Sequence, residues 1–257
     1  MTNRCKRITS ITISLSARTP TVFNYLLICM GAISLIILNW KREENVINNV
    51  RRYALYRLID QVIIFNNNGE VNLKHLSGGT VTVVESSADL GLFTRFAAAG
   101  LAKNACIMHC DDDLFVPEET VDALYKEWFM RPDICHGLEG RLIFDKYNRN
   151  NVIGDVHVVL TRCLLVSKRN CLSAFTFSLN FQDLPGEPAG NGEDIILSYV
   201  SMHNGKQLNR TYRLPYQEHN DTDQNDAPVA IFRRWRHHLA HRTMVVNRCK
   251  KLLFKIG

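Results

Sequence analysis

The sequence predicts an α/β protein with a mostly parallel, mixed β-sheet that carries helices on both faces. Two observations predict this class. From residue 31 to residue 110, short apolar runs alternate with helical stretches, the order typical of βαβ crossovers. The chain also has 257 residues, of which 46% are hydrophobic, enough for a sizeable core without disulfide staples. No tandem period is present, which excludes solenoids and coiled coils.

The first half of the chain supplies the crossovers. Each apolar run is short and ends in polar residues, whereas the intervening stretches have apolar positions at helical spacing. The expected elements are strand Ile33–Leu38, helix Glu43–Leu58, strand Gln61–Phe65, loop Asn66–Leu73, strand Thr80–Glu85, helix Leu92–Ala102 and strand Ala105–Cys110. Since ligands of such sheets bind beyond the carboxyl ends of the strands, the polar strand ends define a candidate site.

The second half is less regular. A helix is expected to stop before Pro132, because the residue before proline disfavours helix. The expected elements are helix Glu118–Phe129, strands Arg141–Phe144 and Val156–Val166, a loop from Gln182 to Gly192, helix Glu193–His203 and a loop from Leu214 to Ala227. Long loops in a domain of this size are commonly lids or binding loops.

The N-terminal region has two mutually exclusive interpretations. Val22–Leu38 is apolar and follows a basic start, as a membrane anchor would, but it is shorter than the roughly 20 apolar residues that a spanning helix needs. We favour a buried strand at Ile33–Leu38, an N-terminal extension at residues 1–30 and a single domain at residues 31–257. The location is left open between a membrane-associated protein of the secretory pathway and a cytoplasmic one.

The charge of the chain is concentrated at its C-terminal end. Of the net charge of +6, Ile231 to Gly257 contributes eight Arg or Lys and no acid, so the rest of the chain is nearly neutral. We therefore expect no nucleic-acid partner. The basic run Phe232–Arg242 has three interpretations: a surface helix that packs through Trp235, Leu239 and Val246, contact with an anionic membrane surface, or a clamp for a diphosphate with a histidine metal ligand.

Three adjacent carboxylates, Asp111, Asp112 and Asp113, follow the apolar strand that ends at Cys110. They repel one another unless a cation neutralises them, and oxygen ligands suit Mn²⁺ or Mg²⁺. In an extended backbone, Asp111 and Asp113 would share one face while Asp112 points elsewhere. The alternative is a solvated acidic turn that caps the helix after Pro117.

A second acidic pair, Glu193 and Asp194, opens a helix after a flexible loop. Capping alone explains acids in a first helical turn. The functional interpretation is that one carboxylate faces the reacting centre, where it accepts a proton from a hydroxyl or stabilises positive charge on a sugar ring.

These features together resemble the GT-A class of nucleotide-sugar glycosyltransferases, and more closely the exostosin-type family 64 catalytic domain, over residues 31–212. The resemblance rests on the order and spacing of several segments. These are the strand end Asn39-Trp40-Lys41-Arg42, Val62–Phe65 running into Asn66-Asn67, Arg95 before the three aspartates, Gly137–Arg141, Val158–Thr161 and Glu193-Asp194-Ile195.

The resemblance implies a metal-dependent transfer of a sugar from a nucleotide donor, a UDP-sugar, to a hydroxyl of a glycan, lipid or protein. It implies the following roles: Arg42, Asn66 and Asn67 on the base and ribose, Arg95 on the nucleotide or diphosphate, Asp111 and Asp112 on the ribose or donor sugar, Asp113 with Asp111 on Mn²⁺ (or Mg²⁺), and Asp194 with Glu193 nearest the sugar. The alternative is a catalytically silent protein of this fold that binds nucleotide-sugar or glycan without turnover.

Overall fold

The structure of the chain is a computed structural model, and it describes residues 32–184, 191–218 and 237–255. Ala32–Gly257 forms one unit and Met1–Gly31 another. The expected N-terminal extension therefore lies outside the described residues, as do residues 22–31 of the apolar segment and Trp235.

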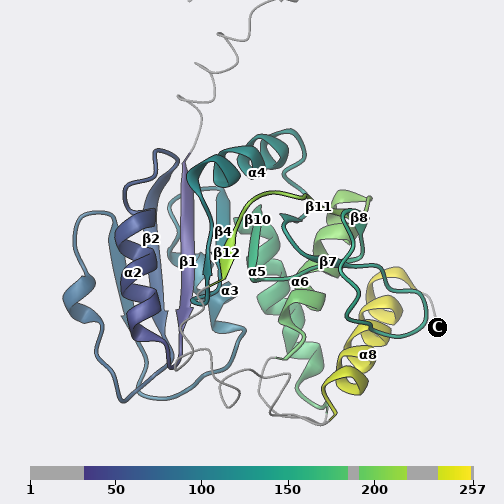
Figure 1. Cartoon of the computed structure of the whole chain (residues 1–257). Coiled ribbons are helices and arrows are strands. Elements are labelled where there is room, and N and C mark those ends of the chain that lie inside the picture. Colours follow the sequence, from purple (N-terminus) through teal and green to yellow (C-terminus); the bar gives the residue numbers. More distant parts are fainter. Residues whose placement is uncertain (1–31, 185–190, 219–236, 256–257) are drawn as a thin grey trace, which may run out of the picture. The chain divides into compact units, whose positions relative to one another are not determined.

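Within the described residues, eight strands form the main sheet in the order β3-β2-β1-β4-β10-β6-β11-β8 (Figure 1). Their bounds are β1 Ile33–Asn39, β2 Ile59–Asn66, β3 Val81–Glu85, β4 Cys106–Cys110, β6 His136–Gly137, β8 Gly154–Val156, β10 Cys163–Ser167 and β11 Asn209–Thr211. Two short pairs lie beside it: β5 Leu114–Phe115 with β12 Gln217–Glu218, and β7 Gly140–Arg141 with β9 Val158–Val159.

The strands β3, β2, β1 and β4 run parallel to one another. β10 is antiparallel to both β4 and β6, and β11 is parallel to β6. The mixed, mostly parallel sheet is therefore confirmed. Because β1, β2 and β4 run in the same direction, Asn39, Asn66 and Asp111 meet at one edge.

Helices cover both faces of the sheet, as the sequence predicts. Their bounds are α2 Glu43–Tyr53, α3 Thr94–Ala98, α4 Glu118–Met130, α5 Lys168–Ser178, α6 Glu193–Gly205 and α8 His238–Cys249. Successive residues of a strand point to opposite faces. Ile36, Ile63 and Ile107 accordingly share one core with α3, α5, α6 and α8, whereas Tyr53 of α2 places its hydroxyl 3.4 Å from Cys110 Sγ on the other face.

The central strand settles the interpretation of residues 33–38. Ile33, Leu35 and Ile37 of β1 are fully buried between β2 and β4, so this segment is a strand rather than part of an anchor. Among the described residues, no helix has the length and apolar character that crossing a membrane requires.

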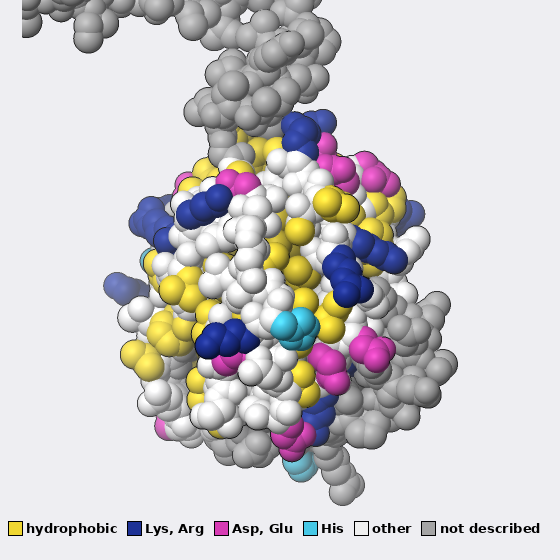
Figure 2. Space-filling model, turned by 90° about the vertical axis from the view of Figure 1, so that its left-hand side faces the viewer, with side chains coloured by type: hydrophobic (Ala, Val, Ile, Leu, Met, Phe, Trp, Pro, Cys, Tyr) yellow, Lys and Arg dark blue, Asp and Glu magenta, His cyan; other side chains and the backbone are white. Residues whose placement is uncertain are grey.

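The side of the domain that carries α2 and the sheet edge at β3 shows charges of both signs. In Figure 2, Lys and Arg side chains are interspersed with Asp and Glu side chains and with hydrophobic ones, and the described residues on this face form no large patch of one sign. The mixed surface agrees with the nearly neutral composition of the chain before its basic C-terminal run.

Four expected elements differ in the structure. The helix expected at Leu92–Ala102 is α3, Thr94–Ala98, followed by a 3₁₀ turn at Ala99–Leu101. The first helix ends at Tyr53 instead of Leu58, and Leu55 is 83% exposed in the turn that follows. The strand expected at Val156–Val166 is divided among the end of β8, β9 and β10, because the chain bends at His157 and turns at Thr161 and Arg162. Of the strand expected at Arg141–Phe144 only β7 is present, one residue earlier.

Two further helices were not firmly expected. α5 has no counterpart among the expected elements, and α8 corresponds to only one of the three interpretations of the basic run. α5 lacks a wide apolar stripe, and its start depends on a local cap in which Ser167 Oγ accepts a hydrogen bond from the Asn170 amide at 3.2 Å. α8 lies in the basic C-terminal run. Its Val246 is fully buried, as the surface-helix interpretation expects, whereas Leu239 is 39% exposed.

Gly137 provides a test of how tightly the second half of the sheet is packed. A Cβ at this position would lie 2.7 Å from the carbonyl oxygen of Cys163 and would overlap Val159. We expect Gly137→Ala to lower the free energy of unfolding by about 1–3 kcal/mol, as overpacking does, measured by urea denaturation. A Cβ at Gly100 meets nothing within 4 Å, so Gly100→Ala should change stability by less than about 0.5 kcal/mol. Equal effects of the two substitutions would contradict the packing.

Candidate active site

The turn that carries Asp111, Asp112 and Asp113 joins β4 to β5. The amide of Asp111 donates to the carbonyl oxygen of Arg162 at 2.9 Å. Asn49 of α2 is buried, and its Nδ2 donates to the carbonyl oxygens of Asp112 and Leu114, each at 3.1 Å. Two elements distant in sequence therefore fix the backbone of this turn.

Each aspartate of the turn contacts an arginine. Arg42 Nη1 lies 2.9 Å from Asp112 Oδ1 and 3.1 Å from Asp113 Oδ2. Arg95 Nη1 lies 3.1 Å from Asp111 Oδ1. The expected strand-like alternation of Asp111 and Asp113 is wrong, because these residues form a turn and one guanidinium joins Asp112 to Asp113.

Burial disfavours negative charge in this turn. It raises the pKa of Asp112 to about 7 against the attraction of Arg42. Burial, followed by the charge of Asp111, raises the pKa of Asp113 as well. The Oδ1 atom of Asp113 is also buried and has no hydrogen-bond partner. A cation beside this atom would satisfy an otherwise unpaired acceptor, so the residues fit a divalent metal ion.

The residues of the aspartate turn suit an ion that takes few of its ligands from the protein. Within the described ranges, no group of three or more His, Cys, Asp or Glu side chains is arranged to hold a metal. Mg²⁺ and similar ions are usually bound by one or two carboxylates together with substrate phosphates. The turn matches that kind of site rather than an all-protein cage.

The second acidic pair lies at the start of α6. Gly192 precedes the helix with φ 102°, and its Cα faces Val245 of α8, whose side chain would be 3.1 Å from an added Cβ. Glu193 Oε1 accepts a hydrogen bond from Thr161 Oγ1 at 3.0 Å. Asp194 forms a buried ion pair with Arg242 of α8. Burial, followed by the charge of Asp194, raises the pKa of Glu193 to about 7.

Arg95 brings the two acidic groups together. The same Nη1 atom that contacts Asp111 is 3.4 Å from the carbonyl oxygen of Thr161, the residue whose hydroxyl donates to Glu193. Arg95 itself is buried, and the charges of Asp111, Glu193 and Asp194 all act on it. The aspartate turn and the start of α6 therefore share one electrostatic environment.

The asparagines at the strand ends are bonded within the protein. Asn66 Nδ2 donates to Glu85 Oε2 at 2.6 Å, and its Oδ1 accepts from Asn39 Nδ2 at 2.7 Å. Asn67 Nδ2 donates to the carbonyl oxygen of Gly91 at 3.0 Å. These contacts hold the loops that follow β2 and β3, and a contact of either amide with a nucleotide stays a prediction.

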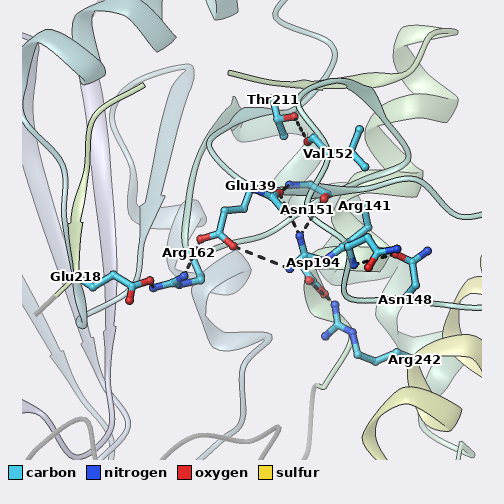
Figure 3. A network of polar contacts seen from close by, with 12 residues as sticks. Glu139, Arg141, Asn148, Asn151, Val152, Arg162, Asp194, Thr211, Glu218 and Arg242 are labelled. Carbon is cyan, nitrogen blue, oxygen red and sulfur yellow. Dashed lines mark hydrogen bonds and ion pairs between the residues drawn. The ribbon is translucent and has the colours of Figure 1, made fainter. Parts of the chain in front are cut away.

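Sequence reasoning missed a chain of alternating charges beside the turn (Figure 3). Arg162 lies 2.6 Å from Glu139 Oε1 through Nη1 and 2.8 Å from Glu218 Oε1 through Nη2. Arg141 continues the chain, with its Nη2 3.9 Å from Glu139 Oε2. Glu139 and Arg141 lie in the Gly137–Arg141 segment of the resemblance, but no spacing in the sequence connects them to Arg162 and Glu218.

The role of Arg242 was also missed, although it lies in the basic run. The run offered a signal, but sequence alone does not show which of its arginines reaches a buried acid. In α8, Arg242 also places its guanidinium 4.3 Å from the centre of the Tyr147 ring. His241 Nε2 lies 3.0 Å from the carbonyl oxygen of Asn191, so α8 is fixed to the segment that starts α6.

Comparisons with known proteins find a matching family and solved structures of similar fold. The model described as the glycosyl transferase family 64 domain matches residues 33–256. No curated protein matches the chain. The solved structure of GalNAc-T7 with UDP, GalNAc and Mn²⁺ is similar with a TM-score of 0.50 and 15% identity, over 72% of this chain and 44% of that chain. The structure of S. aureus TarS residues 1–349 has a TM-score of 0.48 and 11% identity, over 70% of this chain and 57% of that chain.

The chain thus spans about half the length of these solved proteins. At this level of identity the likeness to GalNAc-T7 concerns the fold alone. It supports the GT-A fold that the sequence resemblance implied.

The raised pKa of Glu193 predicts how stability depends on pH. Because the fold favours the protonated form between the ordinary value of 4.5 and about 7, the contribution of Glu193 is complete below pH 4.5 and is lost as pH rises through 7. Glu193→Gln keeps an acceptor for Thr161 but carries no charge. We expect the stability of this variant, relative to wild type, to increase by roughly 2 kcal/mol from pH 5 to pH 8.

The measurement is urea unfolding at several pH values. The matched control is Glu70→Gln, since Glu70 is an exposed carboxylate. A Glu193→Gln variant whose stability follows that of wild type at every pH would show that Glu193 titrates normally.

Proposed function

The chain belongs to glycosyltransferase family 64, and we propose that it transfers a sugar from a nucleotide-sugar donor to a hydroxyl of an acceptor. The observation that carries this proposal is the pairing of the aspartate turn with Glu193 and Asp194 through Arg95 and Thr161. One acidic group would serve the leaving diphosphate and the other the sugar. The resemblance to exostosin-type enzymes supports a UDP-sugar as donor.

On the leaving-group side, Asp113, with Asp111, would hold Mn²⁺ or Mg²⁺. A divalent ion bound there stabilises negative charge on a departing diphosphate. Arg95 is buried and directed at this edge, where its positive charge favours a diphosphate. We assign Arg42, Asn66 and Asn67 to the base and ribose, and Asp111 and Asp112 to the ribose or donor sugar.

On the sugar side, Asp194 is the group that stabilises positive charge. Its ion pair with Arg242 limits the orientations of the carboxylate. Glu193 has a pKa of about 7, a value suited to accepting a proton from an acceptor hydroxyl at neutral pH. The acceptor is a glycan, a lipid or a protein.

Ligand binding provides a first test. A ligand that binds only the native state raises its melting temperature by mass action. We expect UDP with Mn²⁺ to raise the Tm of the chain by several degrees, more than either alone, in a thermal-shift panel of nucleoside diphosphates. GalNAc-T7, which shares the fold, was solved with UDP and Mn²⁺, which supports these probes.

Asp113→Asn should abolish this joint shift, because it removes the charge that attracts the ion. Asp145→Asn, at an exposed carboxylate outside the site, should keep it. A cation-binding module without transferase function would show a shift with Mn²⁺ that UDP does not increase, and that result would contradict the proposal.

Donor hydrolysis tests catalysis without knowledge of the acceptor. With Mn²⁺ supplied, we expect Asp113→Asn to lower the hydrolysis of the matching UDP-sugar by about 100-fold or more, the usual scale for losing a charge-stabilising group. Asp112→Asn should lower it less, because the metal depends on Asp113. Equal rates for Asp113→Asn and wild type would exclude the assignment, and binding without hydrolysis by wild type would favour the catalytically silent alternative.

A further inference from the structure

Two cysteines lie opposite each other directly beside the aspartate turn. Cys110 is the last residue of β4 and precedes Asp111, and Cys163 is the first residue of β10. The antiparallel register pairs Cys110 with Cys163. Both side chains are almost completely buried, and both thiols are free in this structure.

The hydrogen bonds of the ladder define the geometry of this pair. The amide of Asp111 donates to the carbonyl oxygen of Arg162, so the neighbouring pair, Asp111 and Arg162, is a hydrogen-bonded one. Such pairs alternate with non-hydrogen-bonded pairs, whose Cα atoms are about 4.5 Å apart and whose side chains are closer. Cys110 and Cys163 occupy a non-hydrogen-bonded position, and this spacing lies within the range of about 4.4–6.8 Å found in disulfides.

The side chains themselves also meet. The interaction with the Cys110 thiol, followed by burial, raises the pKa of Cys163. On the same ladder, Cys106 faces Ser167 and has no cysteine opposite. Within the described residues, Cys110 and Cys163 are the cysteines that the β4–β10 register places face to face.

We propose that Cys110 and Cys163 form a reversible disulfide site that links the end of β4 to the start of β10. In oxidising surroundings a low-molecular-weight disulfide such as glutathione disulfide is the oxidant. One cysteine thiolate attacks it, releasing one glutathione thiol, and the second thiolate displaces the other. The two cysteines lose two protons and two electrons, the glutathione disulfide gains both and leaves as two glutathione thiols, and one S–S bond replaces another.

The site would act on the turn that follows it. A bond between residues 110 and 163 restrains the adjacent residues Asp111 and Arg162, whose backbone groups are already joined. Both cysteines are almost completely buried, so exchange requires the strands to open or takes place as the chain folds. Reduction of the bond requires the same opening of the strands.

The test is thiol mapping of the whole chain. The protein is equilibrated with excess glutathione disulfide, denatured, alkylated with N-ethylmaleimide and digested. We expect a peptide pair linked through Cys110 and Cys163 that lacks two hydrogens, with Cys106, Cys135 and Cys171 alkylated. Cys163→Ser should abolish the linked pair, and the matched Cys171→Ser variant should retain it.

A second measurement follows the same chemistry. The bond closes a long loop of the unfolded chain, so oxidation should raise Tm by at least about 5 °C. Dithiothreitol should reverse the rise, and Cys163→Ser should not show it. The mapping is repeated at the urea midpoint, where the strands open and close. If Cys110 and Cys163 are still alkylated there, or if the disulfide joins other cysteines, the proposal is wrong.

Discussion

The described part of the domain depends on the neutralisation of buried acids at the carboxyl edge of the sheet. Asp112, Glu193 and Asp194 are all buried, and isolated charges in such surroundings are costly. Arginines from three distant segments reach these acids and their neighbours: Arg42 before α2, Arg95 in α3 and Arg242 in α8. The ion pairs thereby join segments of the fold at the position where a reaction would take place. None of these arginines donates a hydrogen bond to Asp113 Oδ1, which is buried and has no partner. A cation therefore fits beside this atom.

Residues of the basic C-terminal run and of α8 contact the start of α6. Arg242 neutralises Asp194, His241 contacts the segment that starts α6, and Val245 packs against Gly192. At least one positive charge of the run, that of Arg242, is therefore paired with an acid inside the fold. Replacing Arg242 alone would remove the partner of the buried Asp194 carboxylate, and breaking a buried ion pair in this way is strongly destabilising. α8 belongs to the site as well as to the core.

The sequence predicted the elements that local pattern determines. The parallel strands, their polar ends, the position of the three aspartates after β4 and the acidic start of α6 all follow from apolar runs and their flanking residues. It did not predict contacts between distant segments, such as Arg162 with Glu139 or Arg242 with Asp194, because periodicity contains no information on them. The alternation expected for Asp111 and Asp113 was wrong for a related reason: Asn49 and Arg162 hold a turn there. The break at Thr161 and Arg162 was missed because the surrounding residues are uniformly apolar.

The most direct measurement is the position of a bound metal ion. Crystals grown with MnCl₂ and UDP, and recorded for the anomalous scattering of manganese, locate the ion without any assumption about the reaction. We predict one manganese peak beside Asp113 Oδ1, with the diphosphate and Arg95 on the same side. A diphosphate bound elsewhere on the chain, or a manganese ion remote from the aspartate turn, would contradict it.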